Sequence, residues 1–184
     1  MKIETTKKIN KTNRKDYNMP KYYIACLGSY NNGILSGKWF DWATSDTQYW
    51  EQVKEVLDNS QYENAEETAI HDYDGGVNLG EYPDVDRLTE VGCAMDESSE
   101  EIVKAYLENQ GEDADLQCIN DKYVGNYDTE KDFAMSWATD CLGYEENPTW
   151  PMSNIDWDGA TRDLMFDFWT APKQDGTINV FYNN

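Results

Sequence analysis

Negative charge is spread through the segments of this 184-residue chain that must form its core. The formal net charge is -21, although the first 21 residues carry seven basic and only two acidic side chains. The other 163 residues hold 34 acidic and eight basic side chains, a balance of -26. Self-repulsion at this level destabilises a compact state. A chain that folds in spite of it is expected to use this charge on a partner of opposite sign, and most such surfaces hold nucleic acid.

The acidic segments also contain enough apolar side chains to fold. Hydrophobic residues make up 39% of the chain and aromatic residues 14%, including seven Trp and 13 Tyr. This argues against wholesale disorder, because disordered segments contain few aromatic residues. The length fits one domain or a few small modules in series. Four separated cysteines without a Cys-x-x-Cys pair are expected to be reduced and to pack as small hydrophobic residues.

Residues 1–19 are rich in Lys, Asn and Thr and predict a flexible basic tail. Such a tail is simply solvated, screens the acidic body or touches nucleic acid; the sequence leaves these alternatives open. No apolar stretch follows it, as a secretory signal would require, and no run approaches the roughly 18 apolar residues of a membrane span. The chain is therefore expected to be cytoplasmic.

Residues 20–78 are expected to form a small α+β module with an antiparallel sheet. Its predicted elements are a strand over 22–27, a turn over 30–33, a second strand over 34–42 that forms a hairpin with the first, a helix capped by Ser45 or Asp46, and a strand over 68–73. On the helix, Trp50, Val53 and Leu57 are spaced at i, i+3 and i+7, which predicts that they form its buried side.

Residues 79–121 are expected to form a mostly helical middle module. One helix is predicted over 84–95 and a second between Ser98 and Gly111. The second helix starts with the pattern Ser-x-x-Glu over 98–101, which predicts a capping box. Gly111 is a suitable residue to end this helix, because glycine tolerates a positive φ angle.

Residues 122–184 predict a further α+β module, so the expected fold class is α+β with three small modules. Its predicted elements are a strand over 122–124, a helix capped by Asp128 or Thr129 and ended by Gly143, a short helix over 161–165, and a hairpin of strands over 166–170 and 177–182. Within the longer helix, Phe133, Trp137 and Cys141 are expected to face the core.

Recognisable catalytic and metal-binding patterns are missing from the sequence. The single histidine, His71, is expected to be a half-buried strand residue paired with Asp72 or Tyr73. The cysteines lack zinc-ligand spacing, and the two Asp-x-Asp pairs at 72–74 and 156–158 depart from the calcium-binding loop at the next positions. The chain is therefore expected not to be an enzyme and to use no metal or cofactor.

Acidic side chains on one face of a helix have a spacing that can be compared with that of the phosphates of DNA. Residues at i and i+4 have Cβ atoms roughly 5–6 Å apart on a helix, and B-DNA presents one charge per about 3.4 Å along each strand. A balance of -26 matches the phosphates of about 13 bp, and a dimer would match about 26 bp. The candidate partner-binding acids are Glu51, Glu55, Asp58, Asp84, Asp86, Glu90, Asp96, Glu97, Glu100, Glu101, Glu108, Glu112, Asp113 and Asp115.

Charge and spacing alone leave several interpretations open. The acids could form an ordinary solvated surface or that of a salt-adapted enzyme. They could also belong to a decoy that takes the place of DNA in a binding groove, or to an acidic interaction or chaperone module for basic nucleic-acid-binding proteins. A carboxylate-dependent hydrolase is a further alternative, since two acids in one pocket suffice for glycoside hydrolysis.

Several short motifs occur in the order found in one known family. They are 23–33 (YIACLGSYNNG) followed by Leu35, Gly37 and Trp39, then 67–73 (ETAIHDY), 79–82 (LGEY), 123–127 (YVGNY), 142–143 (LG), 154–157 (NIDW) and 162–164 (RDL). From about residue 20 to 182 the chain resembles the ArdA antirestriction proteins. Residues 1–18 depart from the family pattern, and the loop over 144–152 is longer.

The resemblance implies a non-catalytic DNA mimic that occupies the DNA groove of type I restriction-modification enzymes. It implies an elongated chain of three modules that forms a homodimer through the third module. By this resemblance Leu142, Ile155 and Trp157 are candidates for the dimer interface, with ordinary core packing as the alternative for Ile155 and Trp157. The implied partner is the methyltransferase core of a type I enzyme, with no direct contact to nucleic acid and none to a membrane.

Overall fold

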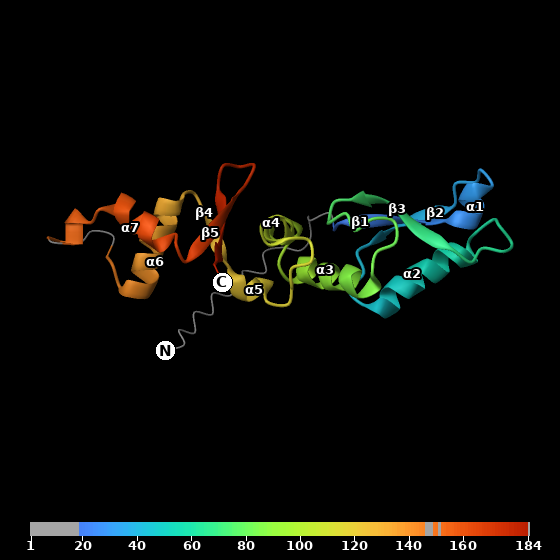
Figure 1. The fold of residues 1–184 in the computed structure, drawn as a ribbon, viewed down its shortest axis with the longest axis horizontal. Coiled ribbons are helices and arrows are strands. Elements are labelled where there is room, and N and C mark those ends of the chain that lie inside the picture. The colour runs from blue at the N-terminus through green and yellow to red at the C-terminus, as the bar shows by residue number, and fades with distance from the viewer. Residues whose placement is uncertain (1–18, 146–148, 151, 184) are drawn as a thin grey trace.

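The protein is an elongated α+β molecule with two small sheets, α3, α4 and α5 between or beside them, and α6 and α7 beyond the second sheet (Figure 1). The computed structural model describes residues 19–145, 149–150 and 152–183. The predicted basic tail over residues 1–19 lies outside the described residues except for Met19. Within the described part, no helix is long and apolar enough to cross a membrane.

The first sheet contains three antiparallel strands in the order β2-β1-β3. Strand β1 (Lys21–Cys26) lies in the middle, between β2 (Gly37–Asp41) and β3 (Thr68–Asp74). Helix α2 (Asp46–Asp58) packs on this sheet and starts where the side chain of Ser45 accepts a hydrogen bond from the Gln48 amide. The three predicted strands and the helix are therefore confirmed.

The connection between β1 and β2 differs from the predicted hairpin turn. A short helix, α1 (Leu27–Asn31), follows β1 directly, and β2 starts only at Gly37. The Asn32 side-chain amide donates to the Gly28 carbonyl at 2.8 Å, a local bond that stabilises a helical turn. Gly33 then adopts a φ of 77°, as expected for a glycine that reverses the chain.

The buried side of α2 was predicted only in part, since Val53 is buried and Leu57 packs against the core but Trp50 does not. Trp50 is 56% exposed, and the residues that face the core are Tyr49, Gln52, Val53 and Val56. This set has the spacing i, i+3, i+4 and i+7, but it includes a polar Gln that hydropathy places outside. Gln52 is buried because its side chain accepts a hydrogen bond from the Tyr22 hydroxyl and donates one to the Asp41 carbonyl.

The middle of the chain contains α3 (Val85–Glu97), α4 (Glu100–Gln110) and the short α5 (Ile119–Lys122), which was not predicted. The predicted capping box at the start of α4 is wrong. The cap is Ser99, whose hydroxyl accepts from the Ile102 amide. Glu101 is therefore in the first turn but is not the third helical residue, and its carboxylate is directed to other partners.

The second sheet has the order β4-β6-β5, so the strand nearest the C-terminus lies in its centre. Strand β6 (Ile178–Tyr182) pairs with β4 (Tyr123–Tyr127) on one side and with β5 (Phe168–Pro172) on the other, both antiparallel. The predicted hairpin of the last two strands is thus confirmed, but its partnership with β4 was not foreseen.

Two longer helices accompany this sheet. Helix α6 (Glu130–Leu142) is capped by Thr129 and ends at Gly143 in the left-handed region, as predicted. Helix α7 (Trp157–Leu164) starts four residues earlier than expected, because Asp156 caps it by accepting from the Gly159 amide. A short 3-10 helix occupies Met152–Asn154.

Strand β6 contributes to both hydrophobic cores of the molecule. The larger core extends from β1 through α2, α3, α4 and α5 and includes Phe181. The smaller core consists of Phe133, Phe168 and Val180 with partly buried neighbours, among them the predicted Trp137. Successive residues of a strand point to opposite faces, so Val180 and Phe181 face different cores. Of the four free cysteines only Cys26 is buried, so only it packs as expected.

Replacing the buried aromatic residue of the smaller core tests its contribution to folding. Phe133 is 0% exposed, and its ring lies 4.8 Å from that of Phe168 and 5.8 Å from that of Trp137. We expect Phe133→Ala to lower the free energy of unfolding by about 3–5 kcal/mol, measured by urea denaturation. The control is Phe166→Ala, since Phe166 is 79% exposed and should change stability by at most about 0.5 kcal/mol. Equal losses in both variants would contradict the assignment of the core.

Candidate partner-binding surface

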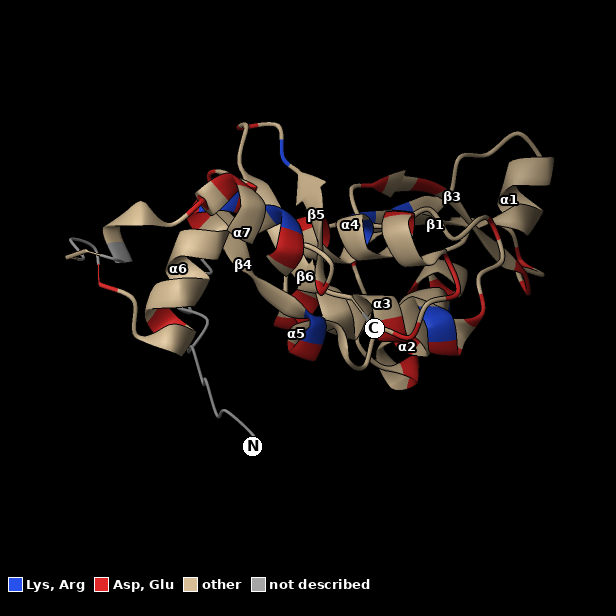
Figure 2. Ribbon diagram, turned by 60° about the vertical axis from the view of Figure 1, so that its left-hand side comes forward, with Lys and Arg blue, Asp and Glu red and all other residues tan. Residues whose placement is uncertain are grey.

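The predicted partner-binding acids are almost all at the surface. Twelve of the fourteen are exposed, and only Glu90 and Glu100 are partly buried. They lie on α2, α3, α4 and the segment after α4, and Figure 2 shows acidic residues distributed over these elements with few basic residues among them. The carboxylates therefore do not converge on one point.

Few of the acids are neutralised by neighbouring basic side chains. Within the described residues, seven acidic side chains form ion pairs, and six basic side chains supply their partners. Four of the predicted acids belong to this group: Glu55, Glu90, Glu100 and Glu101. Most exposed acids of the described residues therefore have no ion pair with another described side chain.

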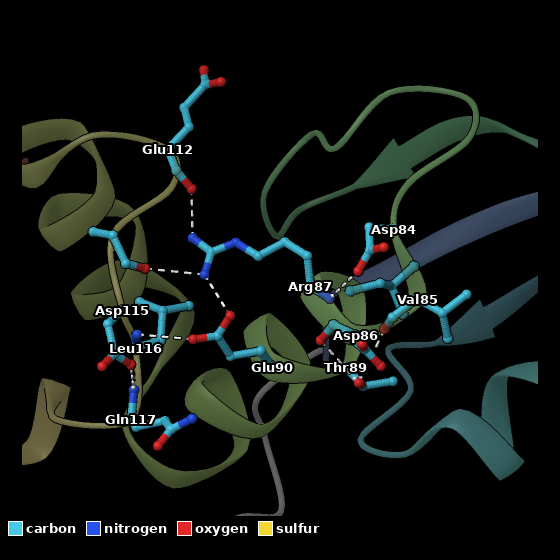
Figure 3. A network of polar contacts seen from close by, with 12 residues as sticks. Asp84, Val85, Asp86, Arg87, Thr89, Glu90, Glu112, Asp115, Leu116 and Gln117 are labelled. Atoms are coloured by element: carbon cyan, nitrogen blue, oxygen red, sulfur yellow. Dashed lines mark hydrogen bonds and ion pairs between the residues drawn. The ribbon is translucent and has the colours of Figure 1, made fainter.

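Arg87 of α3 binds the acidic segment that follows α4 (Figure 3). Its guanidinium donates to the Glu90 carboxylate at 2.6 Å, to the Ala114 carbonyl at 3.0 Å and to the Glu112 carbonyl. The second oxygen of Glu90 accepts from the Leu116 amide at 3.0 Å. Arg87 and Glu90 therefore fix the backbone of this segment through hydrogen bonds to its carbonyl and amide groups.

The same contacts leave the side chains of the segment free to face solvent. Glu112, Asp113 and Asp115 are exposed, and Arg87 contacts the carbonyl of Glu112 rather than its carboxylate. Glu90 thus serves to hold three neighbouring carboxylates outward. Glu90 was expected from the sequence to contact the partner, and its two carboxylate oxygens instead bind Arg87 and the Leu116 amide.

Four other predicted acids have local structural bonds. Asp84 caps α3, and Glu97 accepts from the Asn120 side chain at 3.1 Å. Asp115 accepts from the Gln117 amide at 2.8 Å, and Glu100 accepts from the Gly76 amide and from Lys104. These bonds orient each carboxylate, but only Glu100 among the four is paired with a cation.

Six predicted acids are exposed and have no hydrogen bond or ion pair from their carboxylates to any other described residue: Glu51, Asp58, Asp86, Glu108, Glu112 and Asp113. They occupy α2, α3, α4 and the segment after α4. Within the part of the chain that the structure describes, no other group neutralises these charges, so they are available to a ligand.

Exposed acids also lie outside the fourteen predicted residues, all of which precede residue 116. The C-terminal part exposes eight more on or beside α6 and α7: Asp128, Glu130, Asp132, Asp140, Asp156, Asp158, Asp163 and Asp167. The acids at the start of these two helices follow their cap residues, and this position was a readable signal, since acids are favoured there.

The candidate interface residues have different surroundings. Leu142 is 78% exposed at the end of α6. Ile155 and Trp157 are partly buried, and the Trp157 ring lies edge-on to that of Tyr144 with centroids 5.0 Å apart. Local packing therefore covers part of Trp157, whereas most of the Leu142 side chain remains uncovered.

Neither of two hollows on the described surface gathers many acids. One of about 340 Å³ is lined by residues between Leu35 and Asn59 and contains Glu55, which is paired with Lys38. The other, of about 490 Å³, is lined by β3 and the following turn and includes Asp72 and Glu81. No group of three or more metal-ligating side chains is present in the described part of the chain.

The expectation for His71 is wrong. Its side chain is exposed rather than half-buried, and the ring lies edge-on to that of Tyr30 with centroids 4.9 Å apart. His71 lies where the register of β1 with β3 shifts, since Tyr23 is opposite Asp72 and Ile24 is opposite Ile70, and Tyr30 of the short helix α1 packs against its ring. Tyr73, the predicted partner, donates instead to the Gly80 carbonyl, and burial raises the pKa of Tyr73 to about 12.

Removing the Arg87 side chain tests how the acidic segment is held. We expect Arg87→Ala to lower the free energy of unfolding by roughly 1.5–3 kcal/mol, because it deletes hydrogen bonds to a charged donor and leaves Glu90 unpaired. Amide exchange over residues 112–116 should become faster. The control is Arg162→Ala, which removes the same charge from an exposed side chain. The interpretation would be wrong if both variants exchanged at the same rate over this segment.

The comparison with protein families agrees with this organisation. The family model described as antirestriction protein (ArdA) matches residues 22–178. A search of curated proteins found no match. The matched range begins at the second residue of β1 and ends at the first residue of β6, so it includes every helix and strand between these two strands. On this coverage, the chain belongs to the ArdA family of antirestriction proteins.

Proposed function

We propose that this protein is a non-catalytic DNA mimic that inhibits type I restriction-modification enzymes. It occupies their DNA-binding groove with surface carboxylates in place of phosphates. The observation that carries the proposal is the distribution of the acids: most are exposed, few are paired with cations, and they extend over both halves of an elongated molecule.

The mechanism is electrostatic and requires no chemical step. A groove that binds a duplex presents Lys and Arg side chains at the spacing of phosphates. The exposed acids of α2, α3 and α4 supply charges at a similar but lower density. Because the attraction is the sum of many contacts, it steers the two proteins together and adds to their affinity without one essential residue.

Further details of the proposal concern assembly and partner. The partner is the methyltransferase core, which carries the DNA groove. The protein acts in the cytoplasm as a homodimer joined through its C-terminal part. The exposed Leu142 at the end of α6 supports this arrangement, because association would remove its apolar side chain from water.

Two other functions are less well supported. A carboxylate-dependent hydrolase requires converging acids, and most of the acids here are dispersed over exposed helix surfaces. A general acidic module for basic proteins would have the same surface charge. Competition distinguishes it, because such a module binds unrelated basic proteins as well as it binds the restriction enzyme.

The central experiment measures competition with DNA. The purified protein is mixed with a type I methyltransferase core and its labelled target duplex, and DNA release is followed by fluorescence anisotropy. We expect release near stoichiometric protein and a steep loss of affinity as salt rises, as for a ligand that neutralises many basic groups. A flat salt response, or equal binding to an unrelated basic protein, would contradict the proposal.

Stepwise neutralisation tests whether the charges act as a sum. Each of Glu51→Gln, Asp86→Asn and Glu108→Gln removes an unpaired exposed charge, and each should weaken inhibition by roughly 0.2–1 kcal/mol, less than about sixfold. The triple variant should weaken inhibition by roughly three- to 150-fold, if the separate effects add. The control is Lys54→Gln, which makes α2 more negative and should not weaken inhibition. Complete loss in one folded single variant would refute the summation.

A further inference from the structure

The contact between α4 and the second sheet joins the two acid-bearing parts of the molecule. In Figure 1, α4 lies between the two sheets. Along β6, Asn179 and Phe181 face α4, whereas Val180 between them faces the smaller core. We call this contact between α4 and β6, with its neighbours from β4 and β5, the joint.

An aromatic row forms the apolar part of the joint. Strand register aligns Trp169, Phe181 and Tyr123 across β5, β6 and β4. The rings of Trp169 and Phe181 stack 4.2 Å apart, and Tyr106 of α4 lies 6.1 Å from Phe181. Apolar packing of this kind holds the two parts together, but it is non-directional and does not by itself define their angle.

A polar network beside the aromatic row restricts the angle between α4 and the second sheet. One carboxylate oxygen of Glu101 on α4 accepts from the Asn179 amide at 3.1 Å and lies 3.4 Å from the Lys173 ammonium. The side-chain oxygen Oδ1 of Asn179 accepts a hydrogen bond from the Tyr123 hydroxyl at 3.2 Å. It also lies 3.4 Å from the side-chain nitrogen of Asn126. Asn179 is 3% exposed, so its amide is directed by these partners rather than by water.

The ionisation of Tyr123 is consistent with this network. Burial, followed by the negative charge of Glu101, raises the pKa of Tyr123 to about 12. The phenol therefore remains protonated at neutral pH and continues to donate to Asn179. Hydrogen bonds to charged groups are directional and stronger than neutral ones, so they resist rotation of α4 against the sheet.

We propose that Glu101, Lys173 and Asn179 are positioning residues that hold the acidic surfaces of the two parts at one relative angle. The inference rests on the proposed function, because a groove built for a stiff duplex binds best a mimic whose charges are already spaced. Glu101, expected from sequence to contact the partner, thus acts through the joint.

The decisive variant adds a negative charge and is still expected to weaken inhibition. Asn179→Asp replaces the amide by a carboxylate of the same shape, which faces Glu101 across the 3.1 Å contact. The matched control is Asn64→Asp, the same change on an exposed turn of the first part. If charge alone mattered, both variants would inhibit at least as well as the unaltered protein.

Scattering and inhibition, both measured on the full chain, distinguish a change in the geometry of the joint from a change in function. We expect small-angle X-ray scattering of Asn179→Asp to depart from the unaltered profile, and roughly fivefold or more protein to be needed for half-maximal inhibition. Asn64→Asp should match the unaltered protein in both. An unchanged scattering profile in folded Asn179→Asp would overturn the inference, and so would changed scattering with unchanged inhibition.

A second variant covers the case in which Asn179→Asp does not fold. Lys173→Gln removes only the cation from the joint and also makes the protein more negative, so it too should inhibit less well and scatter differently. Failure of the unaltered protein to inhibit would refute the proposed function, while the scattering comparison would still decide the geometry of the joint. Circular dichroism and a cooperative thermal transition establish folding of each variant.

Discussion

Mutual repulsion of carboxylates is the constraint that shapes this molecule. Most acids lie on helix surfaces and loops that point away from the two cores, and most are not paired with cations. Aromatic packing opposes the repulsion: rings of Tyr22, Trp42, Tyr49 and Tyr73 contact one another in the larger core. Large buried rings supply much apolar area per residue, which suits a chain with few basic side chains.

Two of the few basic residues, Arg87 and Lys173, have structural roles. Arg87 holds the backbone of the segment with Glu112 and Asp113, and Lys173 contributes to the joint through Glu101. In both places a cation orients an acidic region instead of neutralising its outward charges. An acid that is rigidly placed loses less conformational entropy on binding, so rigid placement favours affinity for a fixed pattern of basic groups.

The sequence predicted the ends of helices well, because a cap residue bonds to backbone groups within one helical turn. Ser45 and Thr129 cap their helices as expected, and Gly143 ends α6. Predictions failed where a distant residue decides the outcome. Gln52 is buried because Tyr22, thirty residues away, donates to it, and Trp50 is exposed as a consequence of that choice of face.

The sequence by itself determined the charge, its separation from the basic N-terminal segment, the fold class and the family resemblance, because these depend on composition and on short ordered motifs. Only the tertiary structure decided which acids serve the protein and which remain free for a partner. Glu90 and Glu108 are both helical acids with the same charge, yet one is fixed by Arg87 and the Leu116 amide and the other is exposed. Arg87 is only three residues from Glu90, but both side chains are held by the segment that follows α4, 26 and 27 residues away in the chain, and no local pattern encodes that contact.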